Sequence, residues 1–151
     1  MRVIERNSFT LSGSRWLWLF PAAYFLHIIE ELWGVEAMSG NHLSRTKFIG
    51  LSSAAWLLMV IGLVLAQRFG FPQMLAVCLS TIFVVNGLSH LVHSLMMAGY
   101  ATGVFTGTAI LIPLGLATLI GLRHSMRRRR YLAGIALGII IHGVVTALTI
   151  V

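Results

Sequence analysis

The sequence predicts an all-α membrane protein, a single bundle of five transmembrane helices over residues 1–151. Of the 151 residues, 58% are hydrophobic and only 10% are charged, whereas a soluble domain carries about 25% charged residues. The apolar residues also fall into five runs of about 20, the length that a helix needs to cross ~30 Å of hydrocarbon. No segment alternates over ~10 residues as a membrane barrel requires, so we expect no strands.

Each apolar run is expected to form one helix. The approximate bounds are 16–34, 48–66, 72–97, 101–122 and 131–151. Pro113 lies in the middle of the fourth run, and we expect a kink there because proline lacks a backbone N–H. The first run contains His27 and two glutamates, which a cleaved signal peptide would not carry, so we expect a retained helix.

The positive charges lie mostly on one side of this five-helix topology. Nine of the eleven Lys and Arg residues fall on the side of the N-terminus, and the other side holds Arg45 and Lys47. The nine are Arg2, Arg6, Arg15, Arg68, Arg123 and residues 127–130. We therefore predict that the N-terminus is cytoplasmic and the C-terminus outside. Arg123 and residues 127–130 lie in the loop between the fourth and fifth runs, which we call the arginine loop. We interpret it as a topology signal that contacts lipid headgroups, and no nucleic-acid partner is expected.

Polar residues interrupt the first, third and fifth runs. Glu30 and Glu31 follow His27 by three and four residues, which places both carboxylates on the imidazole's face of a helix. The third run carries a stripe at spacings of four and three, and the fifth carries one histidine. These residues are Asn86, His90, His93 and His142. Because the three helices run in the same direction, the polar groups come at similar depths, to within about one turn.

This set has the chemistry of a metal site. A carboxylate near the bilayer centre costs about 2.5–3.5 kcal/mol on insertion scales, and two adjacent carboxylates also repel each other. A divalent cation removes that cost and takes imidazole nitrogens as further ligands. The predicted ligands are His27, Glu30, Glu31, His90, His93 and His142, enough for one or two ions of iron or zinc. Asn86 is the predicted partner behind the ligands, and Glu30 and Glu31 are the candidate catalytic bases.

Two glycine pairs indicate close packing between helices. Gly103 and Gly107 lie in the fourth run, and Gly134 and Gly138 lie in the fifth. Small residues at this spacing let helix backbones approach each other. We interpret both pairs as contacts within the bundle, with a homodimer as the alternative.

The segment His27-Ile28-Ile29-Glu30-Glu31, followed by Asn86 and His90, resembles the HXXEE-motif family of small bacterial integral membrane proteins. The resemblance covers most of the chain. It implies a multi-pass protein of the bacterial inner membrane that is expected to be an enzyme. It implies no particular substrate or reaction.

The leading hypothesis is a membrane-embedded, metal-dependent enzyme whose substrate, a lipid or another hydrophobic molecule, arrives through the bilayer. A zinc-type hydrolase would use a glutamate as general base. A di-iron oxidoreductase would need a separate electron donor, and the histidine-rich set favours it slightly. The alternatives are a b-type haem carrier, with His142 facing a histidine of the third helix, and a proton or ion translocator.

Overall fold

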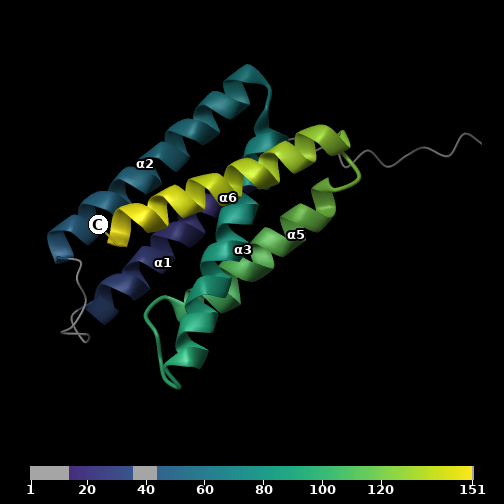
Figure 1. Cartoon of the computed structure of the whole chain (residues 1–151). Coiled ribbons are helices and arrows are strands. Elements are labelled where there is room, and N and C mark those ends of the chain that lie inside the picture. The colour runs from purple at the N-terminus through teal and green to yellow at the C-terminus, as the bar shows by residue number, and fades with distance from the viewer. Residues whose placement is uncertain (1–13, 36–43, 151) are drawn as a thin grey trace, which may run out of the picture.

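The computed structural model describes residues 14–35 and 44–150, and these residues form helices and short connections without a strand. Figure 1 shows their arrangement. In chain order the elements are η1 (Ser14–Trp18), α1 (Leu19–Val35), α2 (Arg45–Phe69), α3 (Pro72–Met96), α4 (Val104–Thr106), η2 (Gly107–Leu111), α5 (Ile112–Leu122) and α6 (Arg128–Ile150). The all-α fold class is confirmed, and the helices follow the predicted runs to within a few residues.

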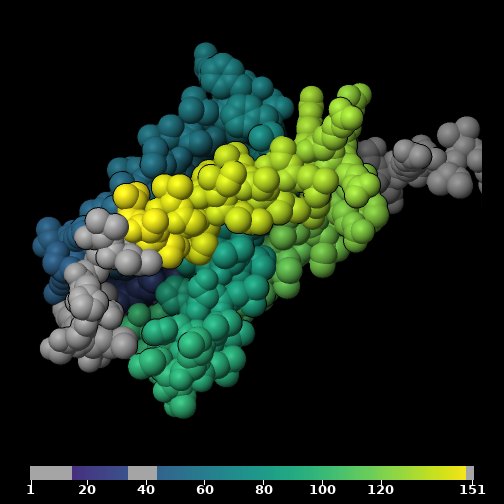
Figure 2. Space-filling view, in the orientation of Figure 1, coloured from purple at the N-terminus to yellow at the C-terminus, as the bar shows by residue number. Residues whose placement is uncertain are grey.

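Four helices are long and apolar enough to cross a membrane: α2, α3, the continuous helix Val104–Leu122, and α6. Their outer faces expose large apolar side chains, such as Leu58 on α2 and Ile140 on α6, as lipid-facing helices do. Figure 2 shows α6 lying along the surface of the molecule. α1 has 17 residues and is preceded by the 3₁₀ turn η1. A crossing by α1, and with it the count of five spans, stays a prediction.

The irregularity expected at Pro113 takes the form of a wider helical turn. η2 is π-helical over Gly107–Leu111, and Pro113 follows as the second residue of α5. A π-helical turn changes the hydrogen-bond pattern where the proline ring and its missing N–H would disrupt a regular α-helix. This turn lies directly after Thr106, a residue of the candidate site described below.

α3 lies between α5 and α6 and packs against both helices and against η2. Glycines allow this close packing. A Cβ on Gly87 of α3 would lie 2.6 Å from the carbonyl oxygen of Gly107, and one on Gly138 of α6 would lie 2.6 Å from that of Cys78. Gly134 of α6 also meets α3, at Val77. Gly107 of η2 and both glycines of the α6 pair therefore serve contacts within the bundle.

Aromatic rings fill the space between α1 and α3 and lead up to His27. The Phe20 and Phe83 ring centroids lie 5.1 Å apart, and the Tyr24 centroid lies 6.4 Å from both Phe83 and His27. The indole of Trp56 on α2 donates a hydrogen bond to the Pro21 carbonyl oxygen, 2.9 Å away. These contacts hold α1 against its neighbours and position His27 at the end of the apolar core.

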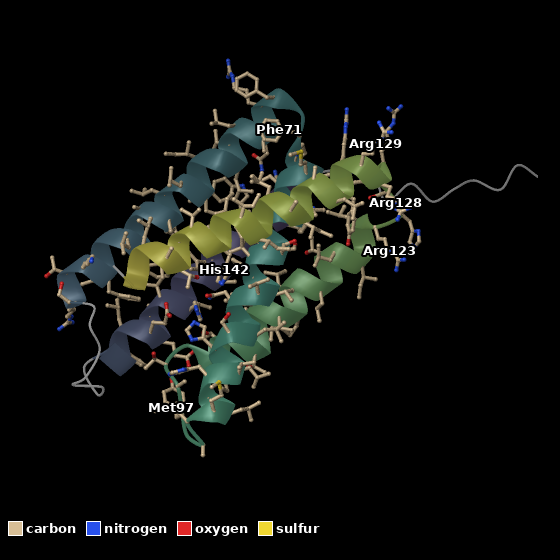
Figure 3. All side chains as sticks on the ribbon, in the orientation of Figure 1. Phe71, Met97, Arg123, Arg128, Arg129 and His142 are labelled. Carbon is tan, nitrogen blue, oxygen red and sulfur yellow. The ribbon has the colours of Figure 1, made fainter. Side chains whose placement is uncertain are left out.

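The arginine loop marks one end of the bundle. Figure 3 shows Arg123, Arg128 and Arg129 at this end and Met97, after α3, at the other. Seven of the nine residues on the predicted positive side are described, while Arg2 and Arg6 lie outside the described residues. Arg45 and Lys47 belong to the start of α2. The separation of charge along the sequence is thus also present along the described helices.

Candidate metal centre

His27 is the most enclosed residue of the candidate site. It lies in the middle of α1 and is 0% exposed. Its Nδ1 lies 2.7 Å from the Thr106 hydroxyl, and its Nε2 lies 2.9 Å from the amide nitrogen of Asn86 on α3. Both ring nitrogens therefore have a polar partner, which a buried imidazole needs.

Glu31 and His90 complete a group with His27. One oxygen of Glu31 lies 3.2 Å from His90 Nε2, and the other lies 3.8 Å from His27 Nε2. The two imidazole rings meet edge to face with centroids 4.9 Å apart. One ligand atom from each of the three residues lies within 4.8 Å of the other two. The structure thus brings residues of the first and third helices together at this group.

The group has the donor types and spacing of a metal site. Ligand atoms 2.0–2.1 Å from a tetrahedral zinc ion lie ~3.3 Å from one another. The distances of 3.2 and 3.8 Å between the Glu31 oxygens and the imidazole nitrogens are close to this value. Two imidazoles and one carboxylate form a common ligand set for zinc and for non-haem iron. His27, Glu31 and His90 together are able to hold one ion.

Glu30 is engaged elsewhere, by the start of the helix Val104–Leu122. Its Oε1 accepts hydrogen bonds from the Tyr100 hydroxyl at 2.7 Å and the Phe105 N–H at 3.0 Å. Its Oε2 accepts from the Thr106 N–H at 2.7 Å and the Thr106 hydroxyl at 2.5 Å. A carboxylate has about four acceptor positions, so these donors use all of them. The negative charge also suits the unpaired N–H groups of a first helical turn.

Sequence reasoning missed the segment from Tyr100 to Thr106, which lies against both histidines. Gly103 has a φ of +83°, and a Cβ there would lie 2.8 Å from Cε1 of both His27 and His90. His90 also hydrogen-bonds the backbone of Thr102. A glycine just before a helix is a weak signal for such a close approach, and Thr106 resembles any other threonine in an apolar helix.

Two predicted ligands lie outside this group. His93 is exposed on α3, where it lines an open groove of about 480 Å³ together with Val85, Leu88, Ser89, Val92 and Met96. His142 is half-buried on α6, and its Nε2 lies 3.5 Å from the hydroxyl of Thr146 on the same helix. Figure 3 labels His142 on α6. Within the described residues, the structure gathers three of the six predicted ligands.

Comparison with known proteins gives one family. Residues 18–118 match the family described as "Protein of unknown function with HXXEE motif". The matched range contains His27, Glu30, Glu31, Asn86 and His90, as well as Gly103 and Thr106, and it stops before α6 and His142. No curated protein and no solved structure matches the chain.

Proposed function

The chain belongs to the HXXEE-motif family, and we propose that it is a membrane-embedded, metal-dependent enzyme that acts on a lipid or another hydrophobic molecule. The observation that carries the proposal is the meeting of His27, Glu31 and His90 among apolar helices. Ionisable groups within membrane-spanning segments are costly and mark functional sites by default. Three protein ligands also leave a coordination position open, as catalytic sites do and structural zinc sites do not.

One ion is favoured over the two of the di-iron hypothesis. A di-iron carboxylate site draws several carboxylates from its helices, and here Glu31 is the one that faces the imidazoles. The acceptor positions of Glu30 are used by Tyr100, Phe105 and Thr106, which also argues against Glu30 as the general base. The proposed ligands are therefore His27, Glu31 and His90, and the ion is zinc or iron.

Each side chain has a distinct part in this proposal. Bound zinc or iron would act as a Lewis acid and lower the pKa of bound water. Glu31, with 18% of its side chain exposed, is the carboxylate that can reach both the ligand group and an incoming molecule. The Asn86 amide donates to His27 Nε2 in this structure; it would release this nitrogen when the ion binds and would then be free to donate to a polar group of the substrate. An iron site would in addition need an electron donor on a separate chain.

The apolar surroundings support a hydrophobic substrate. The groove on α3 has four apolar residues together with Ser89 and His93, and it lies on the helix that carries His90. Its lining comes from α3 alone, so it offers an open apolar face to a chain in the bilayer and not an enclosed cavity. We propose that an acyl or similar apolar chain enters from the bilayer along this groove, and that His93 contacts the substrate rather than the metal.

The helices, charges and glycine contacts also support a topology, a membrane location and an oligomeric state for the enzyme. We propose that α1 crosses the membrane as a fifth span, because Ser14–Val35 is continuously helical. The excess of arginine at the α5–α6 end supports a cytoplasmic N-terminus and a C-terminus outside the inner membrane of a bacterium. The close contacts of Gly134 and Gly138 with α3 favour a monomer over a homodimer through α6.

The proposal is tested by metal analysis and by reaction in vesicles. Full-length protein purified without oxygen should contain about one zinc or iron ion per chain, the stoichiometry of a three-ligand site. Reconstituted into vesicles of bacterial lipid extract, it should convert one lipid class, as detected by mass spectrometry, and His27→Ala should not. Two ions per chain would restore the di-iron hypothesis. A protein that binds no metal, with lipids unchanged in every vesicle, would refute the proposal.

A further inference from the structure

The two glutamates of the motif serve different partners, although they are adjacent in the chain. Glu31 faces His90 at 3.2 Å and His27 at 3.8 Å. Glu30 faces the Tyr100 hydroxyl and the first turn of the helix Val104–Leu122. One residue, Thr106, joins the two sides, because its hydroxyl contacts both Glu30 and His27. A hydrogen-bonded link from Glu30 to His27 thus runs through this hydroxyl.

The hydroxyl of Thr106 has a single proton, and Glu30 determines where it points. Glu30 Oε2 accepts from Thr106 Oγ1 at 2.5 Å, and an ionised carboxylate has no proton to donate in return. The hydroxyl can then only accept from the His27 Nδ1, 2.7 Å away. The imidazole proton therefore lies on Nδ1, and the lone pair lies on Nε2. The amide nitrogen of Asn86, 2.9 Å from Nε2, fits this arrangement as a donor.

We infer that Glu30 is a positioning residue of the metal centre, which acts through Thr106 to hold the His27 proton on Nδ1. The Nε2 lone pair, which accepts from the Asn86 amide in this structure, is then the one that would bind the ion. The inference rests on the metal site proposed above. Histidine ligands commonly donate their second N–H to a neighbouring acceptor, which sets both the tautomer and the ring orientation. Here the acceptor is a hydroxyl that a carboxylate has oriented.

His90 is supported from the same segment of chain. It hydrogen-bonds the backbone of Thr102, while its Nε2 faces Glu31. Gly103 lies between the two supports and lets the segment approach both rings. Glu30 binds the Phe105 N–H at 3.0 Å and the Thr106 N–H at 2.7 Å, so it also holds the segment itself in place. His27 is thus backed by a residue that Glu30 binds, and His90 by a neighbour in the same segment.

The first test uses zinc affinity of the full chain in detergent, with zinc alone as the probe. Thr106→Val keeps the shape and the backbone N–H but removes the hydroxyl. It should weaken the zinc Kd about 10–100-fold, the usual effect of losing such a partner. Thr106→Ser should restore most of the affinity, and Glu30→Gln should weaken it as well. The matched control is Thr81→Val, because Thr81 is also buried and donates only to Val77 of its own helix.

The second test needs no metal. Nitrogen-15 spectra of the histidine rings, with His27→Gln identifying the His27 signals, should show a protonated Nδ1 in wild type. Thr106→Val should give a mixture of both tautomers. Unchanged zinc affinity in Thr106→Val, or a wild-type His27 protonated on Nε2, would overturn the inference. A wild-type protein that binds neither zinc nor ferrous iron would refute the proposed function instead, and the ring spectra would still decide whether Glu30 and Thr106 set the His27 tautomer.

Discussion

Substituting Gly103 by alanine separates a backbone effect from an effect on the metal centre. Gly103 has a φ of +83°, and its added Cβ would lie 2.8 Å from Cε1 of His27 and of His90. Ordinary contacts begin at 3.4 Å, so each ring must retreat by ~0.6 Å or more from a well-packed position. A shift of this size moves both Nε2 atoms relative to Glu31 and degrades the ligand geometry.

The expected loss of folding stability in Gly103→Ala is the sum of two costs. A non-glycine residue at positive φ loses about 1–2 kcal/mol. Overpacking against the two rings adds about 1–3 kcal/mol. Gly70 supplies the matched control, because its φ is +77° and nothing lies within 4 Å of a Cβ there. We expect Gly70→Ala to show the backbone cost alone and Gly103→Ala to show both.

The assay combines unfolding in mixed detergent micelles with zinc competition against a coloured chelator. Gly103→Ala should unfold at a lower denaturing-detergent fraction than Gly70→Ala and should bind zinc about 10-fold or more weakly, as mispositioned ligands do. Gly70→Ala should bind zinc like wild type. Equal stability of the two variants, together with unchanged zinc binding in Gly103→Ala, would refute the argument that this glycine makes room for the histidines.

Three further predictions concern the surroundings of the site. His93→Gln and His142→Gln should each keep wild-type metal content, because neither residue belongs to the His27–Glu31–His90 group; loss of metal in either would return that residue to the ligand set. Gly138→Leu should destabilise the α3–α6 contact by more than about 2 kcal/mol, since a Cβ already meets the Cys78 carbonyl at 2.6 Å, while Gly143→Leu, which faces open space, should not; equal effects would contradict the packing assignment. Desolvation and the hydrogen bond to Glu30 raise the pKa of Tyr100 from 10.0 to about 12. The stabilisation by the neutral Tyr100 hydroxyl is therefore present below pH 10 and is lost as the pH rises through 12. The difference between spectrophotometric titrations of wild type and Tyr100→Phe should show a tyrosine that ionises with a midpoint near 12. A midpoint near 10 would contradict the Glu30 contact.

The helices and part of the site were predictable because their signals are local and periodic. Runs of apolar residues define α2, α3 and α6, and the i, i+4 spacing of His27 and Glu31 places both on one face. Asn86 and His90 share a stripe of α3 for the same reason. A match in depth was enough to bring this stripe opposite His27.

The remaining features of the site depend on how α1 and α3 are rotated about their axes and on the segment from Tyr100 to Thr106. Helical spacing determines neither of these. Glu30 and Glu31 are about 100° apart around α1, and only the packing of the helix Val104–Leu122 decides which of them meets the imidazoles. His93 is only about 60° around α3 from His90 by the same geometry, and yet the structure leaves it exposed. Thr106 and Gly103 gain their importance from a close approach between segments distant in the chain, for which the sequence carries no periodic signal.

Metal content of the purified full chain tests the central claim most directly. Wild type, His27→Gln and His90→Gln would be prepared identically, checked for folding by circular dichroism and size exclusion, and analysed for zinc and iron. We expect about one ion per chain in wild type, as a three-ligand site requires, and background levels in both folded variants, because each lacks one of the three gathered ligands. Full occupancy in both folded variants would contradict the account.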